Sequence, residues 1–494
     1  MMTEKYQREW TLTLLHTNDG HGHLSPIEIS NTDISSQLKS CPPYAPYLNQ
    51  LGGYALLSSQ INKIRETNDN VLLVETGDVF CDSELANLTK GKLHVKVMNH
   101  LKYDAMAPGN HDVDYGIDEL IKRTMEANFP ILAANMINKN TGKPLLGKPY
   151  TVKEVNQVKI GIYGLTYHLT HETTSKNNID GVSFTFSIND IQTDITNLRD
   201  SGVDVIIVLS HLGSSVDRKL AKEVSGIDII VGGHSHEPIP IEVVNNVFIT
   251  QSTPYYTGLG VLKLKFCNYS FVDAEGYIQP ISPKMIDPDS KIEQIINEER
   301  NQYKHILSNV IGSTLTPIVR SYKQESSADT LFGNILRYST NSAISLLPGV
   351  GFGVTIPAGP ITSEQLTNLL PHQSSIYTVL LKGRDILAAL HQSIVNQINP
   401  AVEERVGGLI QVTGLTFTYQ YAATPLIVDA KINDQPIQLE QYYQVVMNQL
   451  MVEGGHKYKS LTNYKKLYQW KQTDKEIVSD WLKKHPNTNS HIQG

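Results

Sequence analysis

Residues 104–116 read DAMAPGNHDVDYG, and this stretch decides how the rest of the chain is interpreted. Directly after a Pro-Gly turn it presents an amide (Asn110), an imidazole (His111) and two carboxylates (Asp112 and Asp114). Such groups bind metal ions or transfer protons, and such a density of them is rarely structural. The stretch therefore predicts a catalytic or metal-binding site to which other parts of the chain contribute.

Further groups of this kind follow segments that the sequence predicts as strands. Residues 10–16 lead to Asp19 and His21, 71–75 to Asp78, 203–213 to His211, and 227–236 to His234 and His236. Because open α/β sheets bind ligands at the carboxyl ends of their strands, we expect these side chains to converge.

The first half of the chain alternates apolar strands with amphipathic helices. Further strands are predicted over residues 130–136 and 158–166, with two more between 247 and 266, and helices are predicted over 52–66, 85–102 and 188–201. Residues 25–50 are rich in Ser, Pro, Asn and Tyr and are predicted to form a surface loop. This alternation indicates a layered α/β architecture.

Composition narrows the class of protein. A chain of 494 residues with 40% hydrophobic and 18% charged residues is long enough for two folded domains. The net charge of −7, without a basic run, argues against a nucleic-acid polymer as partner. Three widely spaced cysteines suggest neither a disulfide framework nor a thiolate metal site. With no apolar run that could serve as a signal or cross a bilayer, we expect a cytoplasmic location and no membrane partner.

The ligand types indicate two divalent metal ions. Oxygen and imidazole nitrogen suit Mn, Zn, Fe or Co, among which the sequence does not discriminate. Hydrolysis of a phosphate ester needs positive charge, an activated water and a stabilised leaving group, which two metals about 3.5–4 Å apart supply. Asp78 stands alone at its strand end and is the natural bridging ligand. His111 follows a ligand and can contact a phosphoryl oxygen or protonate the leaving group, with Asp114 fixing its tautomer.

Seven blocks of sequence resemble, in order, the calcineurin-like metallophosphoesterase domain of the 5'-nucleotidase family. They are LHTNDGHGHL, ETGDVF, APGNHDVDYG, ANM, LSHLG, GGHSH and ITQSTPYYTGLG, spread over residues 10–265. Seven ordered blocks are far more specific than a single GNHD. The resemblance implies an N-terminal four-layer αββα domain over residues 1–283 that holds a dimetal site.

The resemblance also assigns roles to the motif residues. One metal would be held by Asp19, His21, Asp78 and His236, and the other by Asp78, Asn110, His211 and His234. His111 and Asp114 would form the catalytic dyad. Many relatives carry Gln at the position of His236. Asp112 replaces the usual Glu and is interpreted as a helix-start carboxylate or a supporting group rather than a ligand.

Residues 284–310 are predicted as a linker helix, and residues 311–494 resemble the family's α+β C-terminal substrate-binding domain. The matching segments are LFGNI (331–335), AGPITSEQLTNLLP (358–371) and YTVLLKGRDILAAL (377–390). In this family the second domain closes over the substrate.

The C-terminal segment differs from the family at the positions that bind the substrate. The family's arginine falls on Gly353, its two stacking aromatics on His372 and Leu450, and its aspartate on His456. Base stacking contributes about 1–3 kcal/mol per base, so these changes weaken ordinary nucleoside recognition. His372 and His456 are equally compatible with packing roles, and Leu450 with a core position. The candidate substrate-binding residues are His372, Phe352, Tyr377, Asn448, Leu450 and His456.

These observations predict a metal-dependent phosphoester hydrolase. A 5'-nucleotidase that releases phosphate from nucleoside monophosphates through a dimetal-activated water fits best. A 2',3'-cyclic-nucleotide phosphodiesterase, or another hydrolase of small phosphoesters or pyrophosphates, is the alternative within enzymes. A non-catalytic relative that binds a small ligand is the alternative from another class. The altered C-terminal positions favour that last reading, and the His111–Asp114 pair opposes it.

Overall fold

The computed structural model describes residues 9–28, 50–321, 325–420, 426–486 and 488. Most of the loop predicted over residues 25–50 lies outside these ranges. The chain forms two compact units: unit 1 comprises Met1–Cys81, Ala86–Thr170 and Lys176–Asn301, and unit 2 comprises Asp82–Leu85, His171–Ser175 and Gln302–Gly494. Within the described ranges no helix is long and apolar enough to cross a membrane, and the cytoplasmic location stays a prediction.

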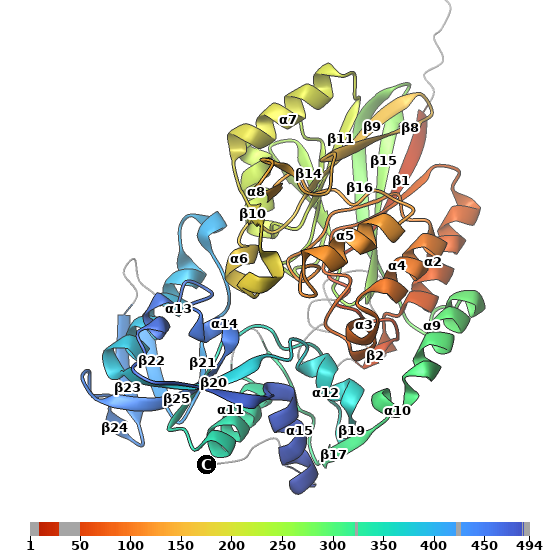
Figure 1. Ribbon diagram of the computed structural model, residues 1–494. Coiled ribbons are helices and arrows are strands. Elements are labelled where there is room, and N and C mark those ends of the chain that lie inside the picture. Colours follow the sequence, from red (N-terminus) through yellow and green to blue (C-terminus); the bar gives the residue numbers. More distant parts are fainter. Residues whose placement is uncertain (1–8, 29–49, 322–324, 421–425, 487, 489–494) are drawn as a thin grey trace, which may run out of the picture. The chain divides into compact units, whose positions relative to one another are not determined.

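Two sheets form the centre of unit 1 (Figure 1). The first has the order β16-β15-β1-β4-β5, with bounds Ser270–Pro280, Gly258–Cys267, Glu9–Thr17, Val71–Glu75 and Ala105–Met106. The second has the order β13-β14-β12-β11-β9-β8, with bounds Ile239–Val244, Val247–Gln251, Ile229–Gly232, Val205–Ser210, Val158–Leu165 and Tyr150–Val155. The strands that precede the candidate ligands are parallel to their neighbours, β1 to β4, and β11 to both β9 and β12.

Helices cover the outer faces of both sheets and complete the four layers (Figure 1). Those beside the first sheet are α2 (Tyr54–Thr67), α4 (Lys92–Leu101) and α5 (Ile117–Glu126), and those beside the second are α7 (Ile188–Asp200) and α8 (Ser214–Glu223). Shorter elements complete the unit: β2 (Ile27–Glu28), β3 (Gln50–Leu51), β6 (Met136–Asn138), β7 (Lys143–Pro144) and β10 (Val182–Phe184). The short helices α3 (Glu84–Thr89) and α6 (Thr170–Thr173) are divided between the two units. The predicted αββα architecture is confirmed.

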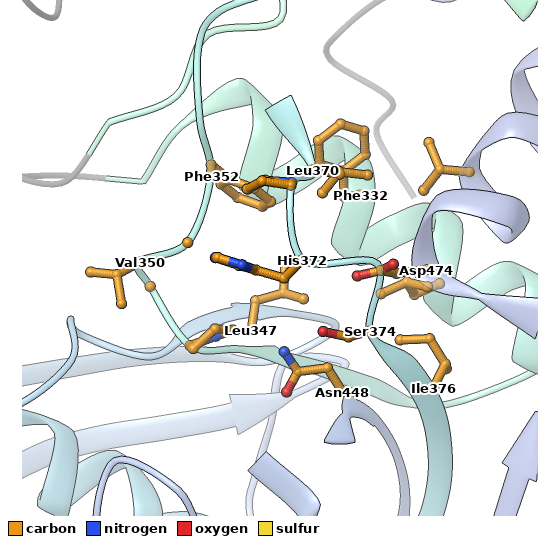
Figure 2. A pocket seen from close by; sticks show the side chains of 16 residues that line it. Phe332, Leu347, Val350, Phe352, Leu370, His372, Ser374, Ile376, Asn448 and Asp474 are labelled. Carbon is orange, nitrogen blue, oxygen red and sulfur yellow. The ribbon is translucent and has the colours of Figure 1, made fainter. Parts of the chain in front are cut away.

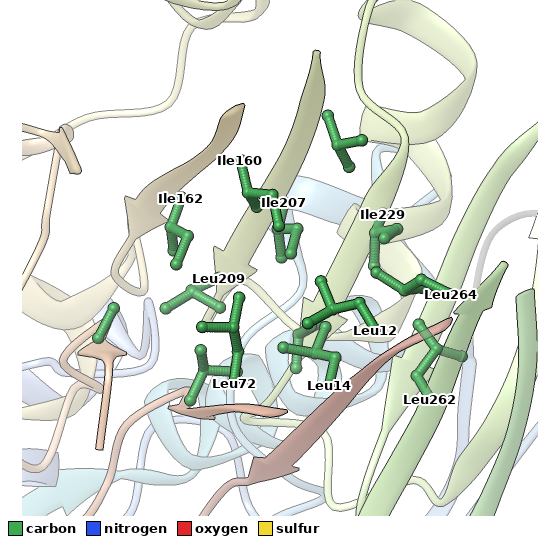
Figure 3. Close-up of a cluster of buried hydrophobic side chains, with 14 of the residues drawn as sticks. Leu12, Leu14, Leu72, Ile160, Ile162, Ile207, Leu209, Ile229, Leu262 and Leu264 are labelled. Carbon is green, nitrogen blue, oxygen red and sulfur yellow. The ribbon is translucent and has the colours of Figure 1, made fainter. Parts of the chain in front are cut away.

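The core of unit 1 lies between the two sheets (Figure 3). Alternate residues of each strand point inward, so Leu12 and Leu14 of β1 meet Ile207 and Leu209 of β11. All four side chains are fully buried. Burial of apolar surface at about 25 cal/mol per Å² is the main favourable term that holds the sheets together.

Replacing Ile207 with Ala is expected to destabilise the protein by about 2–5 kcal/mol, because the cavity left between the sheets cannot fully close. Val243→Ala is the matched control, since Val243 is 57% exposed and surface changes stay within about 0.5 kcal/mol. Urea unfolding of the full chain measures both. Equal effects of the two substitutions would contradict the assignment of the core.

The strand predicted over residues 130–136 is wrong. Leu132 donates its backbone N–H to Met106 in the first sheet at 2.8 Å, and Ala134 donates to Gly164 in the second sheet, also at 2.8 Å. The segment therefore crosses from one sheet to the other, with a single bridge between Met106 and Ile131 before Met136 begins β6. Its apolar side chains are buried, which explains the resemblance to a strand.

The helix predicted over residues 85–102 is two helices, α3 and α4. Lys90 and Gly91 adopt φ values of 47° and 74°, which end the first helix. A Cβ on Gly91 would lie 2.5 Å from the Cβ of Phe80, so the chain requires glycine at this close approach. The predicted linker helix is likewise divided into α9 (Ser290–Gln302) and α10 (Lys304–Leu307).

Unit 2 is built on one mixed sheet with a hydrophobic core on each face. Its strand order is β21-β18-β25-β20-β26, with bounds Gln411–Thr413, Ile344–Leu347, Tyr442–Asn448, Ser375–Lys382 and Leu467–Thr473. One core forms against α11 (Ser327–Thr340), α12 (Ser363–Leu369) and α15 (Asp474–Lys484). The other forms against α13 (Gly383–Ile398), α14 (Gln449–Val452), and the sheet of β22 (Thr416–Gln420), β23 (Leu426–Ile432) and β24 (Gln435–Pro436). The pair β17 (Val310–Thr314) and β19 (Gly359–Thr362) completes the predicted α+β fold.

Candidate active site

Six predicted ligand side chains gather at the carboxyl ends of β1, β4, β11 and β12 in unit 1. They form two groups, within each of which the candidate ligand atoms lie within 4.8 Å of one another: Asp19, His21 and His236, and Asp78, His211 and His234. The prediction that separate strand ends bring these residues together is confirmed.

Short contacts connect the members of each group. The Nε2 atoms of His21 and His236 lie 2.9 Å apart, and Nε2 of His211 lies 3.1 Å from Oδ2 of Asp78. The same His211 nitrogen lies 3.9 Å from Oδ1 of Asp19, so the two groups adjoin. A hydrogen bond joins these nitrogens when one ring carries its proton on Nε2, and a cation bound by both nitrogens would take the place of that proton.

The hydrogen bonding of Asn110 and His211 gives separate evidence for a metal site. The Oδ1 atom of Asn110 is buried and, within the described residues, has no hydrogen-bond partner. A buried acceptor without a partner costs about 1–3 kcal/mol, which a metal ion would offset. Nδ1 of His211 is hydrogen-bonded to the carbonyl oxygen of Thr76, which directs Nε2 into the site. The residues present therefore fit divalent cations.

The electrostatics of the site favour positive charge. Burial alone would raise the pKa of Asp78, but the nearby imidazoles of His211 and His111 lower it well below its usual range. Burial lowers the pKa of His211, but Asp78 and Asp19 outweigh it and raise that pKa to about 9. The carboxylates stay ionised and attract a cation, whether a proton or a metal ion.

His111 and Asp114 form a pair beside the buried ligands. Nδ1 of His111 lies 2.9 Å from Oδ2 of Asp114, and these side chains are 19% and 21% exposed. The backbone N–H of His111 donates to Oδ1 of Asp78 at 2.8 Å, which ties the pair to the ligand groups. Because Asp114 accepts the Nδ1 proton, Nε2 is the ring atom that gains or loses a proton.

Asp112 holds two loops together. Its carboxylate accepts four backbone N–H groups at 2.7–2.9 Å, from Asp78, Val79, Phe80 and Gly109. It does not start a helix, because α5 begins five residues later, so that part of the sequence interpretation is wrong. Its supporting role is structural: one carboxylate fixes the loop of Asp78 against the loop of Asn110.

Five of the seven predicted ligands have left-handed backbone conformations. The φ values are 50° for Asp19, 44° for His21, 56° for Asp78, 69° for His234 and 52° for His236. Residues with side chains rarely adopt this region, and each such residue costs on the order of 1 kcal/mol or more. The surrounding fold enforces these conformations, which is typical of functional sites.

Two residues beside the ligands carry no signal that the sequence analysis used. Asn18 donates from Nδ2 to Oδ2 of Asp19 at 2.7 Å and accepts from the backbone N–H of Ser252 at 2.8 Å. The ring of Tyr167 stacks on His234 with centroids 3.9 Å apart. Asn18 directly precedes a predicted ligand and could have been suspected. Tyr167 follows a strand that supplies no ligand, and nothing in the sequence indicates its role.

Comparisons with known proteins agree with this site. The calcineurin-like phosphoesterase family model matches residues 12–238, and the 5'-nucleotidase C-terminal domain model matches residues 310–463. The chain belongs to the 5'-nucleotidase family. The snake venom 5'-nucleotidase of Crotalus adamanteus is 28% identical over 98% of this chain and 88% of its own length. The trifunctional nucleotide phosphoesterase protein YfkN of Bacillus subtilis is 27% identical over 97% of this chain and 34% of its own length.

A solved structure extends the similarity to the full fold. The 5'-nucleotidase precursor of Thermus thermophilus superposes with a TM-score of 0.87 at 27% identity, covering 98% of both chains. This member of the 5'-nucleotidase family is therefore a metallophosphoesterase that hydrolyses phosphoesters. Its family implies divalent metals, and the donor groups described above are suited to hold them.

Three of the six candidate substrate-binding residues line one pocket of unit 2 (Figure 2). Phe352, His372 and Asn448 come from the loop after β18, the loop before β20 and the end of β25. Their convergence on one cavity keeps them as candidate ligand contacts in this 5'-nucleotidase relative.

The other three candidates lie elsewhere in unit 2. Tyr377 packs against the core that contains α13. Leu450 lies against Gly455, where an added Cβ would meet the leucine Cδ1 at 2.4 Å. His456 is 3% exposed, and its carbonyl oxygen accepts from Nδ2 of Asn396 at 2.7 Å. Direct substrate contact by these three residues stays a prediction.

Proposed function

We propose that this protein is a dimetal 5'-nucleotidase that releases phosphate from nucleoside 5'-monophosphates. The observation that carries the proposal is the pairing of two adjoining ligand groups with a histidine–carboxylate pair beside them. Asp19, His21, Asp78 and His236 would hold one metal, and Asp78, Asn110, His211 and His234 the other. When bound, the metals supply positive charge to the phosphoryl oxygens and an activated water.

The protein's own residues contribute the remaining chemistry. His111 donates a proton through Nε2 to the departing oxygen, because its Nδ1 is held by Asp114 at 2.9 Å. The Asp114 carboxylate stabilises the charged imidazole and fixes its orientation. Asp112 keeps the loops of Asp78 and Asn110 in register, so the donor groups are positioned before substrate arrives.

A 2',3'-cyclic nucleotide is the second candidate substrate. One relative of similar sequence is named a trifunctional nucleotide phosphoesterase, so a nucleotide phosphoester other than a 5'-monophosphate is compatible with this scaffold. The replacement of the family's stacking aromatics by His372 and Leu450 weakens base recognition for both candidates, since both carry the same bases.

Phosphate release from a substrate panel tests the proposal. With Mn²⁺, we expect kcat/KM for AMP, GMP, CMP or UMP to exceed that for glucose 6-phosphate by about tenfold or more, since binding of the nucleoside lowers the barrier. EDTA is expected to abolish turnover and Mn²⁺ to restore it. A preference for 2',3'-cyclic AMP would establish the second candidate. Full activity in EDTA would overturn both.

A further inference from the structure

A third group of metal-binding side chains adjoins the two ligand groups of the candidate active site. Its members within unit 1 are Cys81, His111 and Asp114, whose candidate ligand atoms lie within 4.8 Å of one another. Asp82 follows in the chain but belongs to unit 2, where its Oδ1 atom lies 3.5 Å from Nδ1 of His372. The thiol of Cys81 is buried and, among the described residues, forms no disulfide. The proposed function gives this thiol no role.

Hydrogen bonds fix the backbone on both sides of this group. The Asp112 carboxylate accepts the backbone N–H groups of the two residues that precede Cys81, at 2.8 and 2.9 Å. Asp114 donates its backbone N–H to the carbonyl oxygen of His111 at 3.1 Å. The carbonyl oxygen of Asp114 in turn accepts from Nδ2 of Asn178 at 2.8 Å. The three side chains are therefore held close together before an ion arrives, which lowers the entropic cost of binding it.

The sulfur atom distinguishes this group from the dimetal ligands, which are oxygen and imidazole nitrogen. A thiolate is a soft donor that suits zinc or cadmium, whereas manganese prefers oxygen. Tetrahedral zinc keeps such donors about 3.3–3.5 Å apart, and Nδ1 of His111 already lies 2.9 Å from Oδ2 of Asp114. Small rotations of the three side chains would therefore complete the coordination, with a fourth position left for water.

We propose that Cys81, His111 and Asp114 form an inhibitory site for a soft divalent cation such as Zn²⁺ or Cd²⁺. Binding releases the thiol proton to solvent and places the metal on a ring nitrogen of His111. A coordinated nitrogen carries no proton, so the ring cannot become the imidazolium that protonates the departing oxygen. The inference rests on the proposed function, because it concerns regulation of that site through its general acid.

Exposure and charge both suit capture of such an ion. The side chains of His111 and Asp114 are 19% and 21% exposed, so a cation can reach them from solvent. The sulfur of Cys81 would then complete the coordination away from water, since that residue is 1% exposed. One divalent ion neutralises a thiolate and a carboxylate together. A buried cysteine can also serve as a small apolar side chain, and the experiments below separate the two roles.

Titration of the Mn²⁺-loaded full-length chain with Cd²⁺ tests the site without any turnover. Cadmium on a thiolate gives an ultraviolet charge-transfer absorption, which cadmium on oxygen or nitrogen alone does not give. We expect this absorption to saturate at about one ion per chain and to be lost in Cys81→Ser. His111→Ala is expected to weaken Cd²⁺ binding about tenfold or more. The matched control is Cys267→Ser, which removes a half-buried thiol outside the group and is expected to bind Cd²⁺ as the wild type does.

Inhibition of AMP hydrolysis by Zn²⁺, with Mn²⁺ in excess, tests the regulatory role. We expect Cys81→Ser to keep the basal rate and to raise the Zn²⁺ concentration for half-inhibition about tenfold or more, while Cys267→Ser changes neither. Zinc is expected to inhibit hydrolysis of p-nitrophenyl phosphate less strongly, because its leaving group needs no proton. Zinc that replaced manganese in the dimetal site would instead inhibit wild type and Cys81→Ser equally.

Three results would overturn the inference: thiolate absorption that persists in Cys81→Ser, Cd²⁺ affinity that is unchanged in His111→Ala, or equal sensitivity of wild type and Cys81→Ser to Zn²⁺. Thermal unfolding shows whether each variant is folded, and His111→Ala decides if Cys81→Ser is not. AMP hydrolysis by the wild type without zinc tests the proposed function separately. Its absence would refute that function and the regulation with it, while the Cd²⁺ absorption would still decide whether the metal site exists.

Discussion

Asp78→Asn is expected to reduce metal content to about one ion per chain or fewer and to lower kcat for AMP by more than about 10⁴-fold. Asp78 is the proposed shared ligand, and it is 2% exposed with Nε2 of His211 3.1 Å away. An amide oxygen is a weaker ligand than a carboxylate and carries no charge. With one metal lost, neither the water nor the phosphoryl oxygens receive the charge that the reaction needs.

The substitution isolates metal binding because Asn preserves the local structure. Its Oδ1 still accepts the backbone N–H of His111, as Asp78 does at 2.8 Å. Asn also tolerates the φ of 56° at this position. Metal analysis after dialysis and AMP turnover measure the effect, with Asp273→Asn on exposed β16 as control. A variant with full metal content and a rate within tenfold of wild type would exclude Asp78 as the shared ligand.

His111→Ala is expected to lower kcat for AMP by about 10²–10⁴-fold while metal content is unchanged, as for loss of a general acid. The backbone N–H of His111 donates to Oδ1 of Asp78, and alanine retains this hydrogen bond. The effect is expected to be much smaller for p-nitrophenyl phosphate, because p-nitrophenolate leaves without protonation. The ratio of the two penalties therefore measures proton donation.

Asp114→Asn provides the matched comparison for His111. An amide at this position no longer stabilises the imidazolium, which lowers the pKa of His111 and moves the alkaline limit of the pH–rate profile to lower pH. Loss of metal from His111→Ala, or equal penalties for the two substrates, would contradict the role of general acid.

The candidate metal site could be predicted from sequence because its residues follow buried strands. A β-branched apolar run such as VLLVE (71–75) favours a buried strand, and the carboxyl ends of parallel strands meet at one edge. Asp78 and His211 are therefore predicted correctly as neighbours, although 133 residues separate them in the chain. The sequence does not indicate that the Asp112 carboxylate accepts backbone N–H groups, because such hydrogen bonds depend on the conformation of the loops.

The wrong strand over residues 130–136 shows where apolar pattern alone fails. Burial of Ile131 and Leu132 gives the same pattern whether a segment joins one ladder or crosses between two sheets. The substrate side of the protein is harder to predict for another reason. Tyr377 is predicted as a substrate contact from its residue type alone. An aromatic ring is equally suited to a hydrophobic core, and this ring packs against the core that includes α13.

The left-handed conformations lower the stability of the fold at positions that the proposed function requires. They occur at Asp19, His21, Asp78, His234 and His236. Glycine or asparagine at these positions would relax the backbone, so substitutions that destroy the site also remove a source of instability. Evolution toward a more robust fold therefore favours loss of the ligands unless selection for catalysis opposes it. Substitution of these ligands by glycine or asparagine is therefore expected to raise the unfolding temperature while it abolishes metal binding.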